Sequence, residues 1–205
     1  MDVSAGIMGT MFMISNSLLY PVVIALLGLI AWSLMTFGQF VSEYASRSRD
    51  ITKLDAGCMD AKKQIEKGEF STASAVLISC GSNDLLKKFI RDLSEFIGVD
   101  MFSVRIEKLL QDYELKIARE LEKARLVARL GPVLGLMGTL IPMGPALMGL
   151  STGNIQQLAS NLTIAFSTTV LGLLAGGVAY SVLLVKKRWY TQDLSDMEYV
   201  VEVLK

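Results

Sequence analysis

The sequence predicts an all-α integral membrane protein with three transmembrane helices. Two segments, residues 3–42 and 130–185, contain no Asp, Glu, Lys or Arg. The first holds one apolar run and the second holds two, each long enough to cross a bilayer core, which takes about 20 residues of helix. The two runs are separated by the polar sequence STGNIQQ, which starts at Ser151. Its Ser, Gly and Asn residues favour a turn, so this part of the chain predicts a helical hairpin.

The composition excludes several classes of function. The 20 basic and 20 acidic residues balance, so the net charge shows no bias towards nucleic acid. There is no His, which excludes a His-based metal site and a nucleophile activated by a His base. Cys58 and Cys80 form no CxxC motif, and we interpret them as reduced structural thiols. The sequence therefore predicts no enzymatic activity, no metal and no cofactor.

The chain begins with a Met-rich segment, residues 1–17, which is uncharged after Asp2 and which we interpret as an extracytoplasmic or interfacial helix. It lacks the cationic start of a cleaved signal peptide. The first span is predicted over residues 18–41. Tyr20 near one end and Trp32 towards the other suit side chains that anchor a helix at the membrane interfaces.

The next segment, residues 42–126, is predicted to be a helical domain in the cytoplasm. Helices are expected over 51–67, 71–79 and 84–97, and Ser82 or Asn83 is a candidate cap for the third.

A longer helix follows. No Gly or Pro occurs from about Asp100 to Gly131, and apolar residues recur there at helical spacing. The stripe consists of Ile106, Leu110, Tyr113, Ile117, Leu121, Ala124 and Ala128. This helix is expected to continue into the second span and to stand well out of the membrane.

The remaining elements are the second span over 127–150, an extracytoplasmic turn over 151–156, the third span over 157–185 and a cytoplasmic C-terminal helix over 186–205. Apolar residues continue at helical spacing after Val185. We expect this extension to pack on the long helix or on a neighbouring subunit.

The basic residues predict the orientation. They follow the first span, precede the second and follow the third, whereas residues 3–17 and 151–156 contain none. Because Lys and Arg concentrate on the cytoplasmic side, the N-terminus is expected outside and the C-terminus inside. The flanking residues are Arg47, Arg49 and Lys53; then Arg119, Lys123, Arg125 and Arg129; then Lys186, Lys187 and Arg188.

Two motifs carry a resemblance to a known family. GPVLGLMGTL at residues 131–140 resembles A-P-x-L-G-L-x-G-T-V, and STTVLGLLAG at 167–176 resembles T-T-A-x-G-L-x-x-A. Both patterns belong to the MotA/TolQ/ExbB proton-channel family. The three-span layout with a large insertion after the first span is similar to TolQ and ExbB rather than to the four-span MotA.

The resemblance implies a homopentamer around a central pore in the cytoplasmic (inner) membrane of a prokaryote. It also implies a single-span partner of the ExbD, TolR or MotB kind, in two copies, whose helix carries a titrating Asp. Proton or sodium flow would drive a motor complex. No nucleic-acid partner is expected.

Matched residue by residue, Thr139 and Thr169 fall on the pore threonines of the second and third spans. Thr168 is the adjacent threonine, and Ser167 is a further candidate for pore lining. The competing interpretation of these hydroxyls is helix packing, since Ser and Thr in membrane helices bond back to carbonyls or join helices.

Small residues in the same motifs are candidates for close helix packing and oligomer contacts: Gly131, Gly135, Gly138, Gly172 and Gly176. The sequence departs from the family at two places. Pro142 and Pro145 are expected to bend the second span or to end it early. Ile164 stands where many members have Glu, which leaves the partner's carboxylate as the titrating site.

The sequence thus favours an ion-channel stator subunit. Two alternatives remain: a non-conducting oligomeric scaffold of the same fold and a transporter subunit. The driven process stays open among flagellar-type rotation, outer-membrane and protein transport, envelope maintenance, gliding and phage defence.

Overall fold

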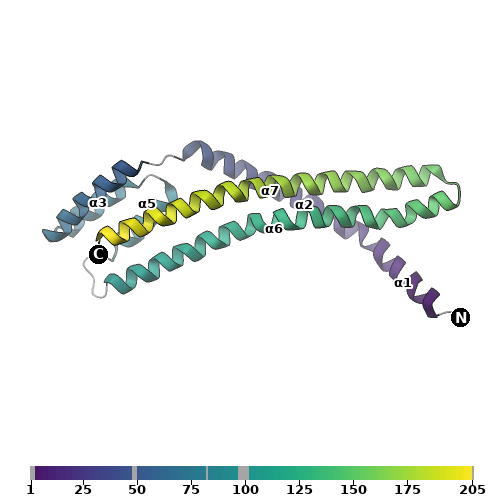
Figure 1. The fold of residues 1–205 in the computed structure, drawn as a ribbon, viewed down its shortest axis with the longest axis horizontal. Coiled ribbons are helices and arrows are strands. Elements are labelled where there is room, and N and C mark those ends of the chain that lie inside the picture. Colours follow the sequence, from purple (N-terminus) through teal and green to yellow (C-terminus); the bar gives the residue numbers. More distant parts are fainter. Residues whose placement is uncertain (1–2, 48–49, 82, 97–101, 205) are drawn as a thin grey trace. The chain divides into compact units, whose positions relative to one another are not determined.

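A computed structural model describes residues 3–47, 50–81, 83–96 and 102–204. Within these residues the chain forms seven helices and no strand (Figure 1). They are α1 (Val3–Ser17), α2 (Leu19–Ser46), α3 (Ile51–Glu66), α4 (Phe70–Cys80), α5 (Asp84–Ser94), α6 (Phe102–Ser151) and α7 (Ile155–Leu204).

The helices divide between two compact units. The apolar unit consists of Met1–Phe40 and Lys123–Leu183, and the charged unit consists of Val41–Glu122 and Leu184–Lys205. Three helical stretches are long and apolar enough to cross a membrane, Gly6–Ser46, Phe102–Ser151 and Ile155–Leu204. The three predicted spans lie within them.

The first apolar stretch is almost continuous. The Leu18 amide donates to the Ile14 carbonyl at 3.2 Å, and the Val22 amide donates to the Leu18 carbonyl at 3.1 Å. Backbone hydrogen bonds of Leu18 therefore join it to both α1 and α2, while Pro21, in the first turn of α2, donates none. Towards the rest of the apolar unit, α2 presents the buried side chains of Val22, Leu26 and Ser33, which share one helix face.

Small residues fill the contact between α6 and α7 in the apolar unit. Most of the buried positions are Gly or Ala, which allows the two backbones to approach closely. On α6 they are Ala124, Val127, Gly131, Gly135, Gly138, Ile141, Pro142, Ala146 and Gly149; on α7 they are Ala165, Thr168, Gly172, Ala175, Gly176, Ala179 and Val182. Large apolar side chains such as Leu140 and Val170 instead lie on the exposed surface of the single chain.

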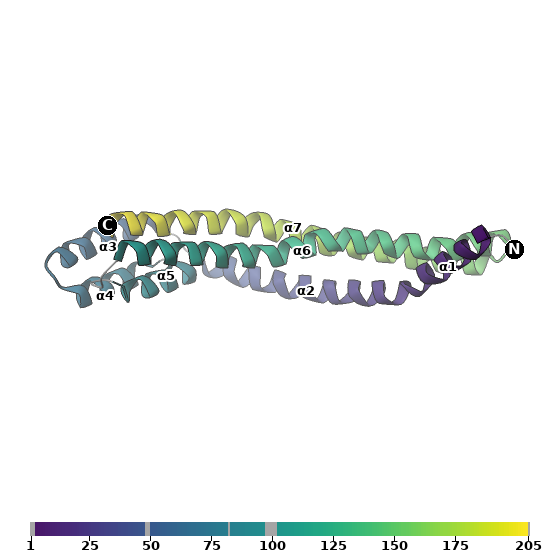
Figure 2. The ribbon, with the colours of Figure 1, turned by 90° about the horizontal axis from the view of Figure 1, so that it is seen from below.

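Neither helix is interrupted within its range (Figure 2). α6 contains Pro132, Pro142 and Pro145 in its interior and ends only at Ser151. The expectation that Pro142 or Pro145 ends the second span early is therefore wrong. That Pro142 and Pro145 bend the second span stays a prediction. The turn between α6 and α7 is three residues long, Thr152 to Asn154, and Gly153 in it has φ +72.

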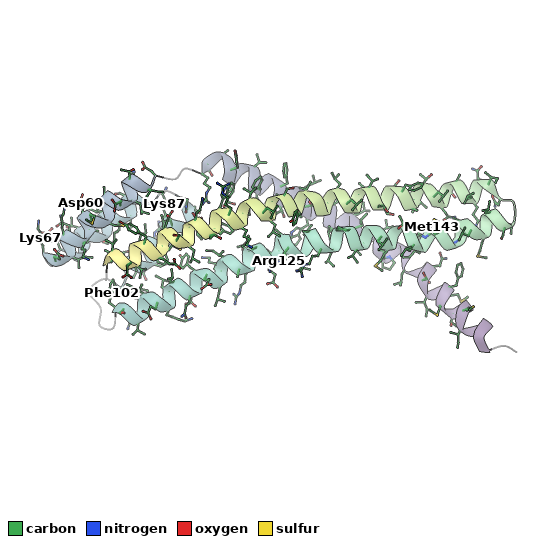
Figure 3. All side chains as sticks on the ribbon, in the orientation of Figure 1. Asp60, Lys67, Lys87, Phe102, Arg125 and Met143 are labelled. Atoms are coloured by element: carbon green, nitrogen blue, oxygen red, sulfur yellow. The ribbon has the colours of Figure 1, made fainter. Side chains whose placement is uncertain are left out.

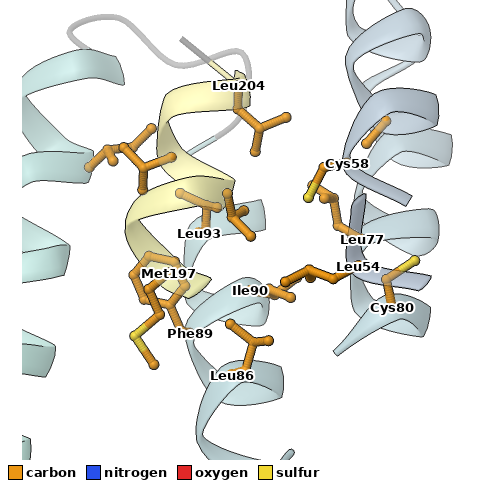
Figure 4. Packing of buried hydrophobic residues seen from close by; sticks show 14 of the residues in the cluster. Leu54, Cys58, Leu77, Cys80, Leu86, Phe89, Ile90, Leu93, Met197 and Leu204 are labelled. Carbon is orange, nitrogen blue, oxygen red and sulfur yellow. The ribbon is translucent and has the colours of Figure 1, made fainter. Parts of the chain in front are cut away.

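The charged unit has its own hydrophobic core, part of which is drawn in Figure 4. The most amphipathic contributor is α5, whose Leu86, Phe89, Ile90 and Leu93 are 0% exposed. The Phe89 ring meets the Tyr113 ring edge-on, with centroids 5.3 Å apart. The buried members are Leu54, Cys58, Ala61, Ala73, Leu77, Cys80, Leu86, Phe89, Ile90, Leu93, Ile106, Tyr113, Met197, Val200, Val201 and Leu204.

Local signals explain where these helices begin. The Asp50 carboxylate accepts a hydrogen bond from the Lys53 amide at 3.0 Å, and the Asn83 side chain accepts one from the Leu86 amide at 2.8 Å. Asn83 is thus the predicted cap of α5, while Ser82 and Ile97 lie outside the described residues. Gly68, with φ +79, allows the tight turn between α3 and α4.

The apolar stripe predicted for the long helix is confirmed by its burial. Ile106, Tyr113, Ile117, Leu121 and Ala124 are all 9% exposed or less. The expected start of this helix, near Asp100, lies outside the described residues. The predicted C-terminal extension is also helical, and its Met197 and Val200 are fully buried in the core of the charged unit.

Candidate functional site

The motif glycines of α6 and α7 lie against one another. A Cβ atom built on Gly172 would lie 2.6 Å from the Gly131 carbonyl oxygen and 2.7 Å from the Gly135 Cα. One built on Gly176 would lie 2.6 Å from Cδ of Pro132. Since real Cβ contacts are longer than this, only glycine fits at these positions without a shift of the backbone.

Thr168 lies in this contact. Its side chain is 6% exposed, and a Cβ atom on Gly138 would lie 2.5 Å from its Oγ1. The hydroxyl donates to the carbonyls of Ile164 at 3.0 Å and Ala165 at 2.9 Å, both on its own helix. In the single chain, the Thr168 hydroxyl therefore faces α6 and is closed off from solvent.

Thr169 lies opposite Gly135 of α6, and Thr139 lies one helical turn further along α6. The half-buried Thr169 hydroxyl is 3.3 Å from the Gly135 carbonyl oxygen and 3.2 Å from that of Ala165. Thr139 follows Gly135 by one helical turn, and in an α-helix its amide donates to that same Gly135 carbonyl. The Thr139 hydroxyl is half-buried too and donates to the Leu136 carbonyl at 2.7 Å.

Ser167 is exposed and donates to the Thr163 carbonyl at 2.7 Å. Each of the four candidate hydroxyls thus has an acceptor for its proton, and each oxygen keeps lone pairs that can accept from water or from a bound group. These groups can orient a proton donor or solvate a cation. They cannot themselves titrate near neutral pH.

The hairpin also contains no other side chain that could bind and release a proton near neutral pH. Residues 130–185 have no Asp, Glu, Lys, Arg or His, and Ile164 is 40% exposed. In the side-chain view of Figure 3, Met143 marks this uncharged part of α6, whereas Asp60 and Lys67 mark the charged α3 and its end. A proton relay through a membrane uses ionisable side chains, so this chain alone lacks one in its spans.

Two contacts hold the N-terminal helices to the hairpin within the apolar unit. The buried Ser33 hydroxyl of α2 donates to the Ala175 carbonyl of α7 at 3.3 Å. The ring of Phe12 in α1 lies over Gly144, where an added Cβ atom would be 3.0 Å from it. No sequence motif marks Ser33 or Phe12, because each partner lies far away in the chain.

A buried polar cluster in the charged unit was also missed by the sequence analysis. Asp193 of α7 is 0% exposed and accepts hydrogen bonds from Arg47 at 2.5 Å and from the side-chain Nδ2 of Asn83 at 2.7 Å. Arg47 also donates to the Trp189 carbonyl at 3.2 Å, and its guanidinium lies 5.0 Å from the centroid of the Trp189 ring. We call Arg47, Asn83, Trp189 and Asp193 the Asp193 cluster.

The Asp193 cluster joins segments that are distant in sequence. It ties the end of α2 to the start of α5 and to α7. A second ion pair, Lys186 with Glu43 at 2.8 Å, lies between α7 and α2 as well. Burial raises the pKa of Asp193, and the hydrogen bonds from Arg47 and Asn83 oppose that rise.

These features define the class of the protein. Three long apolar helices, two of them in a tight glycine-lined hairpin without charge, are the features of a multi-pass membrane protein. A model of the MotA/TolQ/ExbB proton channel family matches residues 82–198, more than half of the chain, and the chain belongs to this family. A comparison with curated proteins gives no match. Membership indicates an ion-channel subunit of an energy-transducing complex rather than an enzyme.

Proposed function

We propose that this chain is the pore-wall subunit of an ion-driven motor complex, in which five copies surround two single-span partner helices. One observation carries the proposal. The hairpin is free of ionisable groups over residues 130–185, and both of its helices carry a partly exposed threonine hydroxyl, about one helical turn apart. Such a wall can solvate an ion or orient a proton donor, while the titrating Asp belongs to the partner.

Thr139 and Thr169 are the residues assigned to the ion pathway, with Ser167 as a third. Their hydroxyls remain at least partly exposed in the single chain. Thr168 is assigned here to the contact with Gly138 rather than to the pathway, because burial already encloses its hydroxyl. Ile164 has no carboxylate, so no side chain of this subunit's spans carries the proton in the proposed mechanism.

The orientation is part of the proposal. With the N-terminus outside, the charged unit lies in the cytoplasm of a prokaryote and the α6–α7 turn faces the extracytoplasmic side. The distribution of Lys and Arg supports it. The ion is a proton or sodium, since hydroxyl oxygens serve either.

The second candidate is an oligomeric scaffold of the same fold that conducts nothing. The glycine contacts favour it as strongly as they favour a channel, because close packing is needed in both. The third candidate function is that of a transporter subunit. The partner separates these candidates: a single span with an Asp in it, followed by an extracytoplasmic domain, supports the motor.

The test is ion uptake by cells or proteoliposomes that contain this chain with such a partner. Val replaces a Thr hydroxyl with a methyl group of similar size. The Thr139→Val, Thr169→Val double variant removes two hydroxyls that contact the ion or its carboxylate. We expect uptake to fall about tenfold or more, since a hydrogen bond to a charged group contributes about 1.5–3 kcal/mol.

Thr163→Val is the matched control, because Thr163 is exposed on the same helix and its hydroxyl donates to the Ala159 carbonyl of its own helix. Its uptake should stay at the wild-type level. Unchanged uptake in the double variant would show that the pathway is assigned to the wrong residues. A wild-type complex that conducts nothing, yet assembles, would instead favour the scaffold.

A further inference from the structure

An open groove of about 500 Å³ lies between α3 and α7 in the charged unit. It is lined by Ile51, Thr52, Leu54, Asp55, Ser195, Asp196 and Tyr199. Leu54 is 2% exposed and forms part of the floor, whereas Ile51 is 55% exposed. The groove is large enough for a few side chains of a bound peptide, since small-ligand sites occupy about 300–1,000 Å³.

The polar groups of the groove are acidic and aromatic. The Tyr199 hydroxyl donates to Oδ1 of Asp55, which fixes the carboxylate beside the Tyr199 ring. That ring is 40% exposed. Asp196 also lines the groove but is only 7% exposed and already has a partner, so Asp55 is the carboxylate open to a ligand. A carboxylate next to an exposed aromatic face and apolar side chains suits a guanidinium or ammonium group with its aliphatic stem.

The surroundings strengthen this charge preference. Between Trp189 and Leu204 the chain contains Asp193, Asp196, Glu198 and Glu202 but no Lys or Arg. Lys53 is the basic residue that adjoins the groove residues in α3. Nucleotides and anionic lipid headgroups would be repelled. The described residues hold no group of three potential metal ligands, so a metal ion is not favoured either.

We propose that this groove binds a basic cytoplasmic segment of the single-span partner, by receiving an Arg or Lys side chain between Asp55 and Tyr199. The inference rests on the proposed function, which supplies the partner. Because the extracytoplasmic domain of the proposed partner follows its span, the partner's N-terminus lies in the cytoplasm. Lys and Arg concentrate next to the span on that side, so its tail has the complementary charge.

The tail can reach the groove. Ser195 follows Val185 by ten residues of continuous helix, which corresponds to about 15 Å along the axis of α7. About five residues of extended chain cover that distance. A partner tail of about five residues or more therefore covers this distance along α7.

Binding is measured with the full-length chain in detergent micelles and a short fluorescent peptide containing Arg and Leu. A second peptide carries citrulline in place of each Arg, which keeps the shape and removes the charge. We expect the Arg peptide to bind at least about tenfold more tightly than the citrulline peptide.

Asp55→Lys is the test variant, and Glu66→Lys is its matched control. Both residues are exposed on α3, and both changes alter the net charge equally, but Glu66 is not among the groove residues. Asp55→Lys should weaken binding at least about tenfold and Glu66→Lys less than about twofold. If Asp55→Lys does not fold, Asp55→Asn replaces it, with an expected loss of about threefold. Equal losses at the two positions would overturn the proposal.

A photo-reactive side chain at Thr52 identifies the occupant in the intact complex. Cross-links to the partner residues that precede its span support the proposal. Cross-links to a second copy of this chain, or none to the partner, refute it. Ion uptake is measured in the same cells: conduction without the partner cross-link refutes the groove alone, whereas a wild-type complex without conduction refutes the proposed function.

Discussion

At the scale of single residues, Cys58 shows how burial changes chemistry. Burial, with Cys80 and Asp55 adding to the effect, raises the pKa of the Cys58 thiol from 9.0 to about 11. The thiolate is the reactive form. A Cys80→Ala variant isolates this thiol. At pH 8 the folded variant should react with iodoacetamide up to about a hundredfold more slowly than the unfolded variant, because burial, the largest cause of the shift, remains when Cys80 is removed.

The same pKa shift predicts how the free energy of unfolding changes with pH. Between pH 9.0 and about 11, the folded state holds the Cys58 proton while the unfolded state releases it. The free energy of unfolding should therefore fall as pH rises through this window and be unaffected by Cys58 below it. Thermal unfolding of Cys80→Ala, with and without Cys58→Ala, checks the effect; equal pH profiles would contradict it.

Thr168 and Thr169 show how two adjacent residues of one helix can have different surroundings. Thr168 and Thr169 occur in the same motif, and the sequence assigns both to the candidate pathway. A step of one residue turns the side chain by about 100° around the helix. In the structure Thr168 faces Gly138, while Thr169 is half-buried beside Gly135. A difference of this kind depends on where the neighbouring helix lies.

At the scale of elements, the contact between α6 and α7 predicts a sharp contrast between two glycines. An Ala at position 172 would push into the backbone of α6, with contacts of 2.6 and 2.7 Å. Gly177 on the same helix has no atom within 4 Å of an added Cβ. We expect Gly172→Ala to cost about 1–3 kcal/mol through overpacking. Gly177→Ala should be neutral or stabilising by up to about 1 kcal/mol.

Thermal unfolding in detergent measures both variants under the same conditions. A Gly172→Ala protein as stable as Gly177→Ala would show that α6 and α7 do not meet along these glycines. The two substitutions make the same chemical change on one helix, so helix propensity alone cannot separate them.

The Asp193 cluster makes a second prediction at this scale. Arg47→Met would leave a fully buried carboxylate without its cation, at a cost of about 3–5 kcal/mol. The double variant with Asp193→Leu removes that charge as well and should recover much of the loss. Denaturant unfolding measures both variants. Independent, additive effects would contradict the pairing.

An exposed ion pair provides the control for this measurement. Lys88 and Asp84 lie 2.8 Å apart on α5, with side chains 58% and 85% exposed. Lys88→Met should cost no more than about 1 kcal/mol, because solvent screens exposed pairs.

At the scale of the whole molecule, the proposed function predicts assembly into a pentamer. Leu136, Leu140, Phe166 and Val170 are each 59% exposed or more in the single chain. In the proposed complex these surfaces face lipid or neighbouring subunits. Native mass spectrometry of the purified protein should give the mass of five copies, and two more masses of the partner when it is co-purified. A stable monomer would contradict the architecture.

The sequence by itself determined the class of the protein. The absence of charge over residues 3–42 and 130–185 is a property of composition, and water-excluded helices follow from it whatever their partners. The sequence predicted helix boundaries where the signal is local, as at the Asn83 cap and at Gly68. Only the tertiary structure decided which side chains meet: Thr168 with Gly138, Asp55 with Tyr199, and Arg47 with Asp193. The residues of each pair are distant in the sequence. The spacing of residues along one helix does not show how that helix is rotated against its neighbour.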